Sequence, residues 1–141
     1  MLKRAAYKMM TKRTLKRAAT RPVVIGVCYH RFEVLPHDDP LAGMAITPER
    51  FVKQIQWMRE VGTISSQEKL FGGPLEAGVH FFLSFDDGYE DNLTALVPIL
   101  RARRLPCTLF VTADFVRGTL PRFEHDEAMG FAPAALSPGQ L

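Results

Sequence analysis

The chain has 141 residues, of which 47% are apolar and 23% are charged, a composition typical of one globular domain of about 100–200 residues. It contains no run of about 18 apolar residues, so the sequence excludes a membrane-spanning helix. The formal net charge of +3 is unevenly distributed, because residues 1–21 hold eight of the 18 Lys and Arg residues and no acidic residue. The rest of the chain is therefore acidic, with ten basic against fifteen acidic side chains.

Residues 1–21 are predicted to form a basic helical leader ahead of a domain at 22–141. A basic segment without acids could bind an anionic membrane surface or nucleic acid, or form a solvated helix that packs on a partner. Its apolar stripe is weak, which favours the solvated or partner-packing helix. Peripheral membrane contact is the alternative, and we expect no nucleic-acid partner. The leader lacks the apolar stretch of about 7–15 residues that defines a secretory signal, so a cytoplasmic or membrane-peripheral location is favoured.

The β-branched run Val23–Tyr29 predicts the first buried strand. His30 follows at its carboxyl end, where parallel α/β folds gather their ligands, so His30 is a candidate near-site residue. A structural, hydrogen-bonded histidine is the alternative. Cys28 and Cys107 adjoin apolar runs and are expected to be buried free thiols. Neither has a nearby Cys or His at metal-ligand spacing, so we expect no zinc or catalytic role for them.

Residues 31–46 lack periodicity and read as a surface loop, in which His37 and its two acidic neighbours are not expected to bind a metal. A helix is predicted from the Thr47 cap to Gly62, because Pro and Glu occupy its first turn and apolar residues keep to one face. A short strand at 63–65 and a short helix at 66–70 should follow.

The stretch His80–Asp91 carries the strongest functional signal of the sequence. Its apolar positions predict a strand buried on both faces, and Asp86 and Asp87 stand where this strand should end, before Gly88. Ionised carboxylates leave water only where a cation, a hydrogen-bond network or a proton compensates them. The pair therefore predicts metal binding or acid–base chemistry. An ordinary Asp-Asp-Gly turn is the alternative.

Apolar residues at helical spacing over 93–100 predict a helix, which Pro98 should kink or start. The next buried strand is expected at 107–111. Strand, helix and strand at this spacing form a parallel crossover unit, so we predict an α/β fold with a parallel sheet, either open or closed into a barrel. Beyond Asp114 the pattern weakens until Ser137 and the following Pro, which resemble a helix cap and its first residue.

The segment Ser84–Tyr89, Ser-Phe-Asp-Asp-Gly-Tyr, resembles the first motif of the polysaccharide deacetylases, carbohydrate esterase family 4 or the NodB-homology domain. Three further segments resemble that family in the expected order: 27–32 is similar to the Tyr-His segment of many bacterial members, 47–51 to the helix after it, and 106–111 to a later strand. Together they cover residues 22 to about 116. The resemblance implies the N-terminal portion of a distorted (β/α) barrel with parallel strands, incomplete in this chain.

The same resemblance implies a metal-dependent hydrolase that removes N-acetyl groups from the amino sugars of a glycan, cleaving a carbon–nitrogen bond. Asp86 corresponds to the general base, and Asp87 to a ligand of a divalent metal, most often zinc. Adjacent strand residues point to opposite sides, so both can serve one site only if Gly88 lets the backbone turn. His30 and Tyr89 would lie near the site.

The family completes its metal site with a later His-x-x-x-His segment, and this sequence has no such pair. Its four histidines are His30, His37, His80 and His125. We therefore expect a domain at 22–141 that is truncated before the metal-histidine motif, and an inactive fragment on its own, because a catalytic zinc takes three protein ligands. Metal binding by this chain alone is thus not expected.

Three other interpretations are weaker or stay open. His125 and Asp126 could replace the missing ligands, but a solvated insertion explains them more simply. A non-catalytic remnant that binds a glycan or a partner is the alternative to the enzyme. A phosphotransfer enzyme with Asp86 as nucleophile is disfavoured, because Gly88 takes the place of the second acid in the Asp-x-Asp pattern of that chemistry.

Overall fold

The computed structural model describes residues 15, 20–32, 44–124, 130 and 133–141. Most of the basic leader, the segment around His37, and the His125–Asp126 pair lie outside the described residues. None of the helices in the described part is long and apolar enough to cross a membrane.

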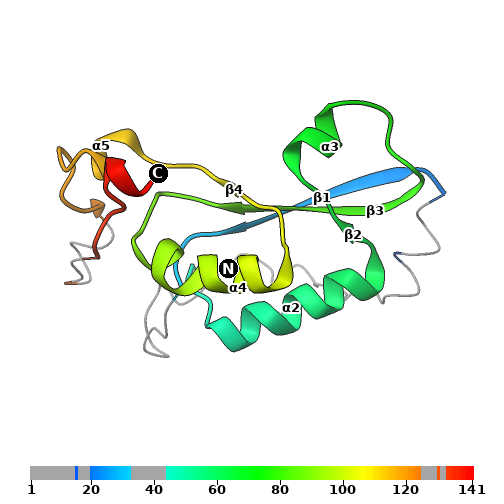
Figure 1. Ribbon diagram of the computed structural model, residues 1–141, viewed down its shortest axis with the longest axis horizontal. Coiled ribbons are helices and arrows are strands. Elements are labelled where there is room, and N and C mark those ends of the chain that lie inside the picture. Colours follow the sequence, from blue (N-terminus) through cyan, green and yellow to red (C-terminus); the bar gives the residue numbers. More distant parts are fainter. Residues whose placement is uncertain (1–14, 16–19, 33–43, 125–129, 131–132) are drawn as a thin grey trace, which may run out of the picture.

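The strands and helices predicted between residues 22 and 111 are present in the predicted order (Figure 1). The elements of the described residues are β1 (Pro22–Tyr29), α2 (Pro48–Val61), β2 (Thr63–Ile64), α3 (Gln67–Phe71), β3 (Gly78–Phe85), the π-helical turn η1 (Asn92–Leu96), α4 (Val97–Arg103), β4 (Thr108–Leu109), α5 (Ala113–Val116) and the 3-10 turn η2 (Pro138–Gln140). Two details differ from the sequence prediction. β4 is shorter than the strand expected at 107–111, and α5 was not predicted.

Local sequence signals explain where the helices begin. The Thr47 hydroxyl accepts a hydrogen bond from the Arg50 amide at 3.3 Å, and Ser66 caps α3 in the same way through Lys69. Pro98 lies in the first turn of α4, after the η1 turn. A proline is tolerated there because its position needs no backbone donor. Pro98 therefore marks the start of α4.

The sheet is parallel throughout, with β3 at its centre. β1 pairs with the whole of β3, from Pro22 opposite Gly78 to Tyr29 opposite Phe85. On the other edge of β3, β2 pairs near its beginning and β4 at its end. Each parallel connection passes through a helix, so the predicted α/β architecture is confirmed, and the barrel is incomplete.

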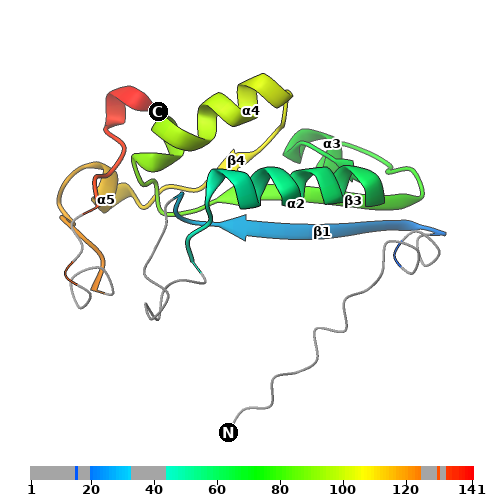
Figure 2. The same ribbon diagram turned by 90° about the horizontal axis from the view of Figure 1, so that it is seen from below.

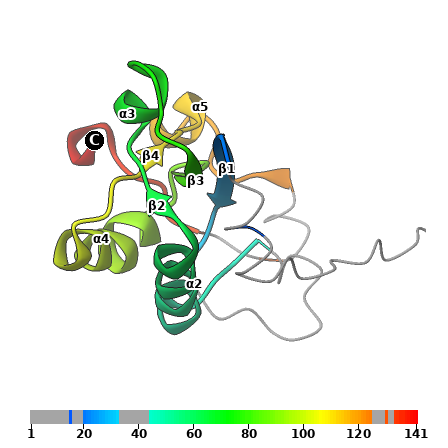
Figure 3. The same cartoon turned by 90° about the vertical axis from the view of Figure 1, so that its right-hand side faces the viewer.

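The core lies between the sheet and two helices. α2 and α4 lie side by side against the strands (Figures 2 and 3), and the Arg59 guanidinium joins them by a hydrogen bond to the Arg103 carbonyl at 2.7 Å. The alternate residues of β3 that face these helices are almost fully buried. These β3 residues share the core with Phe51, Ile55 and Met58 of α2, Leu96 of η1 and Leu100 of α4. The β3 residues are Val79, Phe81, Leu83 and Phe85.

The face of β1 away from these helices is open, so the prediction of a buried first strand is only half right. Its residues alternate between exposed and partly buried positions, and Val24 is 49% exposed. Cys28 lies on this face and is exposed, as is Cys107, which corrects the prediction of buried thiols. In a (β/α) barrel the face opposite the helices is the barrel interior. An incomplete barrel therefore leaves that face uncovered.

Candidate active site

The chain turns sharply where β3 ends, at the predicted pair of aspartates. The Asp86 amide still donates to the Tyr29 carbonyl of β1 at 2.9 Å, so Asp86 extends the strand pairing by one bond. The next two residues have left-handed backbone, with φ of 75° at Asp87 and 89° at Gly88. This is the turn that the Gly88 position predicts, and it lies directly after the end of β3, at Asp86 and Asp87.

Two segments hold this turn in place. The Asp87 carbonyl accepts a hydrogen bond from the Thr112 amide at 3.0 Å, just beyond β4. The Gly88 carbonyl accepts from Leu136 at 2.8 Å, within the returning segment that also pairs with Tyr89. The motif is thus fixed by backbone bonds from both sides, as a preorganised site requires.

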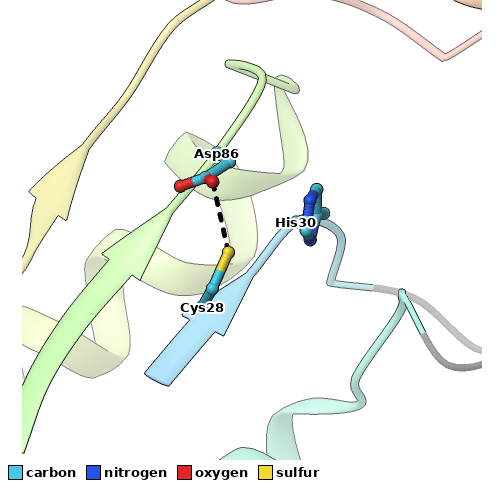
Figure 4. Close-up of side chains that lie close together, drawn as sticks. All are labelled: Cys28, His30 and Asp86. Atoms are coloured by element: carbon cyan, nitrogen blue, oxygen red, sulfur yellow. Dashed lines mark hydrogen bonds between the residues drawn. The ribbon is translucent and has the colours of Figure 1, made fainter. Parts of the chain in front are cut away.

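Asp86 meets two side chains of β1 and its carboxyl end. The Cys28 thiol donates to Asp86 Oδ2 at 3.2 Å, and a ligand atom of His30 lies within 4.8 Å of both (Figure 4). Cys28 and His30 are two residues apart on a strand, so they share a face, and Cys28 is in register with Ser84, two residues before Asp86. The expectation that Cys28 has no neighbour at metal-ligand spacing is therefore wrong.

The electrostatics of this group centre on the Asp86 carboxylate. Partial desolvation, followed by the hydrogen bond to Asp86, raises the pKa of the Cys28 thiol above its usual value. Cys28 thus carries its proton at neutral pH and acts as donor. The second carboxylate oxygen, Asp86 Oδ1, is buried and makes no hydrogen bond to the residues that the structure describes. Such an atom is costly unless a proton, water or cation completes it.

His30 has no hydrogen-bond partner among the described residues, whereas His80 has two. His80 is 5% exposed, donates from Nε2 to the Glu76 carbonyl at 2.9 Å, and accepts at Nδ1 from the Ser65 hydroxyl at 3.3 Å. His80 is thus a satisfied structural histidine. Of these two histidines, His30 is the one whose ring nitrogens are available to bind a ligand.

Tyr89 lies directly after the turn, but its ring is only 1% exposed. It packs edge-on against Phe115, with the ring centroids 5.3 Å apart, and the Arg31 guanidinium lies 5.0 Å from its ring centroid. A buried ring with these neighbours anchors the segment after Gly88.

A cavity of about 560 Å³ opens beside Cys28 and His30, between the end of β1 and the first turns of α2. Its far wall carries Arg50, Lys53 and Gln54. Both cationic side chains lie within one helical turn of each other, so this wall is positively charged and polar. The cavity gives a small ligand a route to Cys28 and His30.

The residues do not fit the metal site that the resemblance implies. That site needs two histidines beside Asp87, and among the described residues one group of three or more ligating side chains lies close together: Cys28, His30 and Asp86. Asp87 is not part of it. The histidine that does reach the site, His30, approaches Asp86 instead.

Behind the turn, Asp91 connects the site to β1. Its Oδ2 accepts a hydrogen bond from the Phe32 amide at 3.0 Å and lies 4.0 Å from Arg31 Nε. Burial raises the pKa of Asp91 above its ordinary value of 3.8, against the opposing effects of the Phe32 amide and of Arg31. The carboxyl group thus ties the loop after β1 to the helical segment after the turn.

We expect Asp91→Asn to remove a pH dependence of stability. Because burial raises the folded-state pKa of Asp91, the native chain holds this proton to a higher pH than the unfolded chain, so the stability of the wild type falls as pH rises through that window. Asparagine keeps an acceptor for Phe32 and does not titrate. Urea unfolding should be measured from pH 3 upward. The free energy of unfolding of the variant, relative to that of the wild type, should rise with pH until the raised pKa of Asp91 is passed. If the difference in unfolding free energy between the variant and the wild type does not change with pH, or falls as pH rises, the pKa of Asp91 is not raised.

The comparisons with known proteins agree with this geometry. Residues 77–132, which contain the turn, match the polysaccharide deacetylase family. No curated protein sequence matches the chain. Among solved structures, IcaB from Ammonifex degensii is similar, with 22% identity and a TM-score of 0.61 over 83% of this chain and 46% of that chain.

Two further structures show the same fold. The Streptococcus pyogenes deacetylase PplD, solved in complex with acetate, has 25% identity and a TM-score of 0.60, over 85% of this chain and 51% of that chain. The de-N-acetylase from Aggregatibacter actinomycetemcomitans has 19% identity and a TM-score of 0.55, over 66% of this chain and 38% of that chain. The chain thus spans about half the length of these proteins, or less. Residues 77–132 match the model of the polysaccharide deacetylase family, and the fold is similar to part of these solved structures, as the sequence motifs predicted.

Proposed function

We propose that this chain provides the base-bearing part of a deacetylase that hydrolyses N-acetyl groups on the amino sugars of a glycan. The observation that carries the proposal is the Asp86–Gly88 turn at the carboxyl end of β3, inside the segment that matches the family. Parallel α/β folds place their chemistry at this end of the strands. The backbone bonds from Thr112 and Leu136 support a rigid site there.

Asp86 is the general base in this proposal. A carboxylate that takes a proton from water must have an oxygen that is not already satisfied, and Asp86 Oδ1 has no hydrogen-bond partner among the described residues. The activated water would attack the amide carbonyl of the acetyl group, and acetate would leave the sugar nitrogen. Cys28 holds the other oxygen at 3.2 Å and so orients the carboxylate.

Metal dependence belongs to the proposal on the strength of the family alone. A divalent metal, zinc in the first instance, would polarise the carbonyl and lower the pKa of its water. Asp87 would contribute one ligand, and the described residues supply no histidine pair beside it. We therefore propose that the 141-residue chain does not release acetate by itself, and we derive no catalytic step from the metal.

The test of the base is Asp86→Asn in a form of this protein that releases acetate, assayed on N-acetylglucosamine oligomers. Loss of a positioned general base typically costs about 10²–10⁴-fold in rate, so kcat should fall by that amount while KM changes little. Asp114→Asn is the matched control, because Asp114 is an exposed acid in the first turn of α5. If Asp86→Asn keeps the wild-type rate, Asp86 is not the base.

A further inference from the structure

We propose that Cys28, His30 and Asp86 bind one thiophilic divalent cation, such as Zn²⁺ or Co²⁺, in this chain. The set combines a thiol, an imidazole and a carboxylate, whose ligand atoms all lie within 4.8 Å of one another. These are the three ligand types that zinc uses in proteins. The site differs from the one implied by the family resemblance, because it uses Asp86 in place of Asp87 and takes its histidine from the residue that follows β1.

The distances are close to those of a bound ion. Zinc bonds of about 2.3 Å to sulfur and about 2.0–2.2 Å to nitrogen or oxygen place tetrahedral ligands roughly 3.3–3.6 Å apart. The Cys28 sulfur and Asp86 Oδ2 are already 3.2 Å apart. Only His30 must approach, by at most about 1.5 Å on that geometry. No hydrogen bond to a described residue holds its ring back.

Backbone pairing between β1 and β3 brings Cys28, His30 and Asp86 close together. Cys28 and His30 alternate onto one face of the chain at the end of β1, and the Asp86 amide is bonded to the Tyr29 carbonyl between them at 2.9 Å. Asp86 Oδ1, buried and without a partner in the described structure, is a second observation that points to a missing cation. A ligand can reach the group through the cavity beside Cys28 and His30.

Binding exchanges a proton for the metal. The Cys28 S–H bond breaks, its proton passes to solvent, and the thiolate sulfur bonds to the cation in place of its hydrogen bond to Asp86. Three protein ligands leave a fourth position for water, as in open zinc sites. On the proposed function, a cation held here would occupy the oxygen atoms of the base and so inhibit deacetylation.

The test is a cobalt titration of the chain, followed by the thiolate-to-cobalt charge-transfer band in the near ultraviolet, with zinc calorimetry in parallel. We expect one ion per chain and a band. Cys28→Ser should abolish the band and weaken zinc binding by at least about tenfold, as loss of metal-supporting residues generally does. Cys107→Ser, which changes the other exposed thiol, should leave both unchanged. Circular dichroism checks that every variant is folded.

Two outcomes overturn the inference. One is a Cys28→Ser variant that titrates like the wild type. The other is metal binding that Asp87→Asn removes and Asp86→Asn does not, which would place the ion in the family's site and leave the proposed function standing. Conversely, a charge-transfer band that depends on Cys28, together with full activity of Asp86→Asn in the acetate-release assay, would support the metal site and refute the assignment of Asp86 as general base.

Discussion

Replacing Phe85 with alanine is expected to lower the free energy of unfolding by about 3–5 kcal/mol, the usual cost of truncating a buried phenylalanine. Phe85 is fully buried at the last position of β3. Its ring stacks on Tyr29 with centroids 5.1 Å apart and lies 5.7 Å from Phe51 of α2. Alanine would leave a cavity among these rings, which the paired strands cannot close. Urea denaturation of the chain measures the loss.

Two matched variants keep this prediction testable even if the alanine variant does not fold. Phe85→Leu retains most of the volume and should cost less than about 1.5 kcal/mol. Phe71→Ala removes the same side chain from a position that is 78% exposed, where surface substitutions stay within about 0.5 kcal/mol. Equal losses at Phe85 and Phe71 would show that the aromatic cluster does not support the strand that carries Asp86.

The larger elements were predictable because their signals are local. The Thr47 and Ser66 hydroxyls cap α2 and α3 within their own segments, and Pro98 is tolerated only in a first helical turn. The apolar run before Asp86 needed no tertiary information to be assigned to a buried strand. Each of these features is decided by residues within about one turn of one another, which a single sequence displays.

The features that sequence reasoning missed depend on contacts between distant segments. The openness of β1 depends on which strands and helices cover it, and a continuous run of β-branched residues does not say whether both faces are covered. β4 is short although the apolar run is longer, and Phe110 is 52% exposed. An apolar residue keeps its β propensity even where no partner strand lies beside it.

The Cys28 contact illustrates the same limit at the site. Cys28 and Asp86 are 58 residues apart, and only the register of β1 against β3 brings them together. The sequence signal that could have found the group is the Cys-x-His spacing at the end of a predicted strand, because alternation places these two side chains on one face. The motif residues alone pointed to Asp87, and the fold adds the neighbours that Asp86 actually has.

Gly88→Ala is expected to destabilise the chain through both backbone strain and crowding. A side chain at a φ of 89° costs about 1–2 kcal/mol in the left-handed region. In addition, the new Cβ would lie 3.1 Å from Val111 Cγ1 and 3.2 Å from Val116 Cγ2, and such overpacking adds about 1–3 kcal/mol. Urea unfolding should therefore show a larger loss than strain alone produces.

Gly118→Ala separates the two contributions. Gly118 has a φ of 77° with nothing within 4 Å of the position of a Cβ, so alanine there meets the strain without the crowding. The difference between the two variants measures the crowding at the turn, and Val111→Ala in the Gly88→Ala background should recover part of it. If both glycine variants lose the same free energy of unfolding, and Val111→Ala recovers none of it, the turn accommodates a side chain at Gly88 without crowding. The sharp turn at Asp86 and Asp87 would then need a cause other than close packing against Gly88.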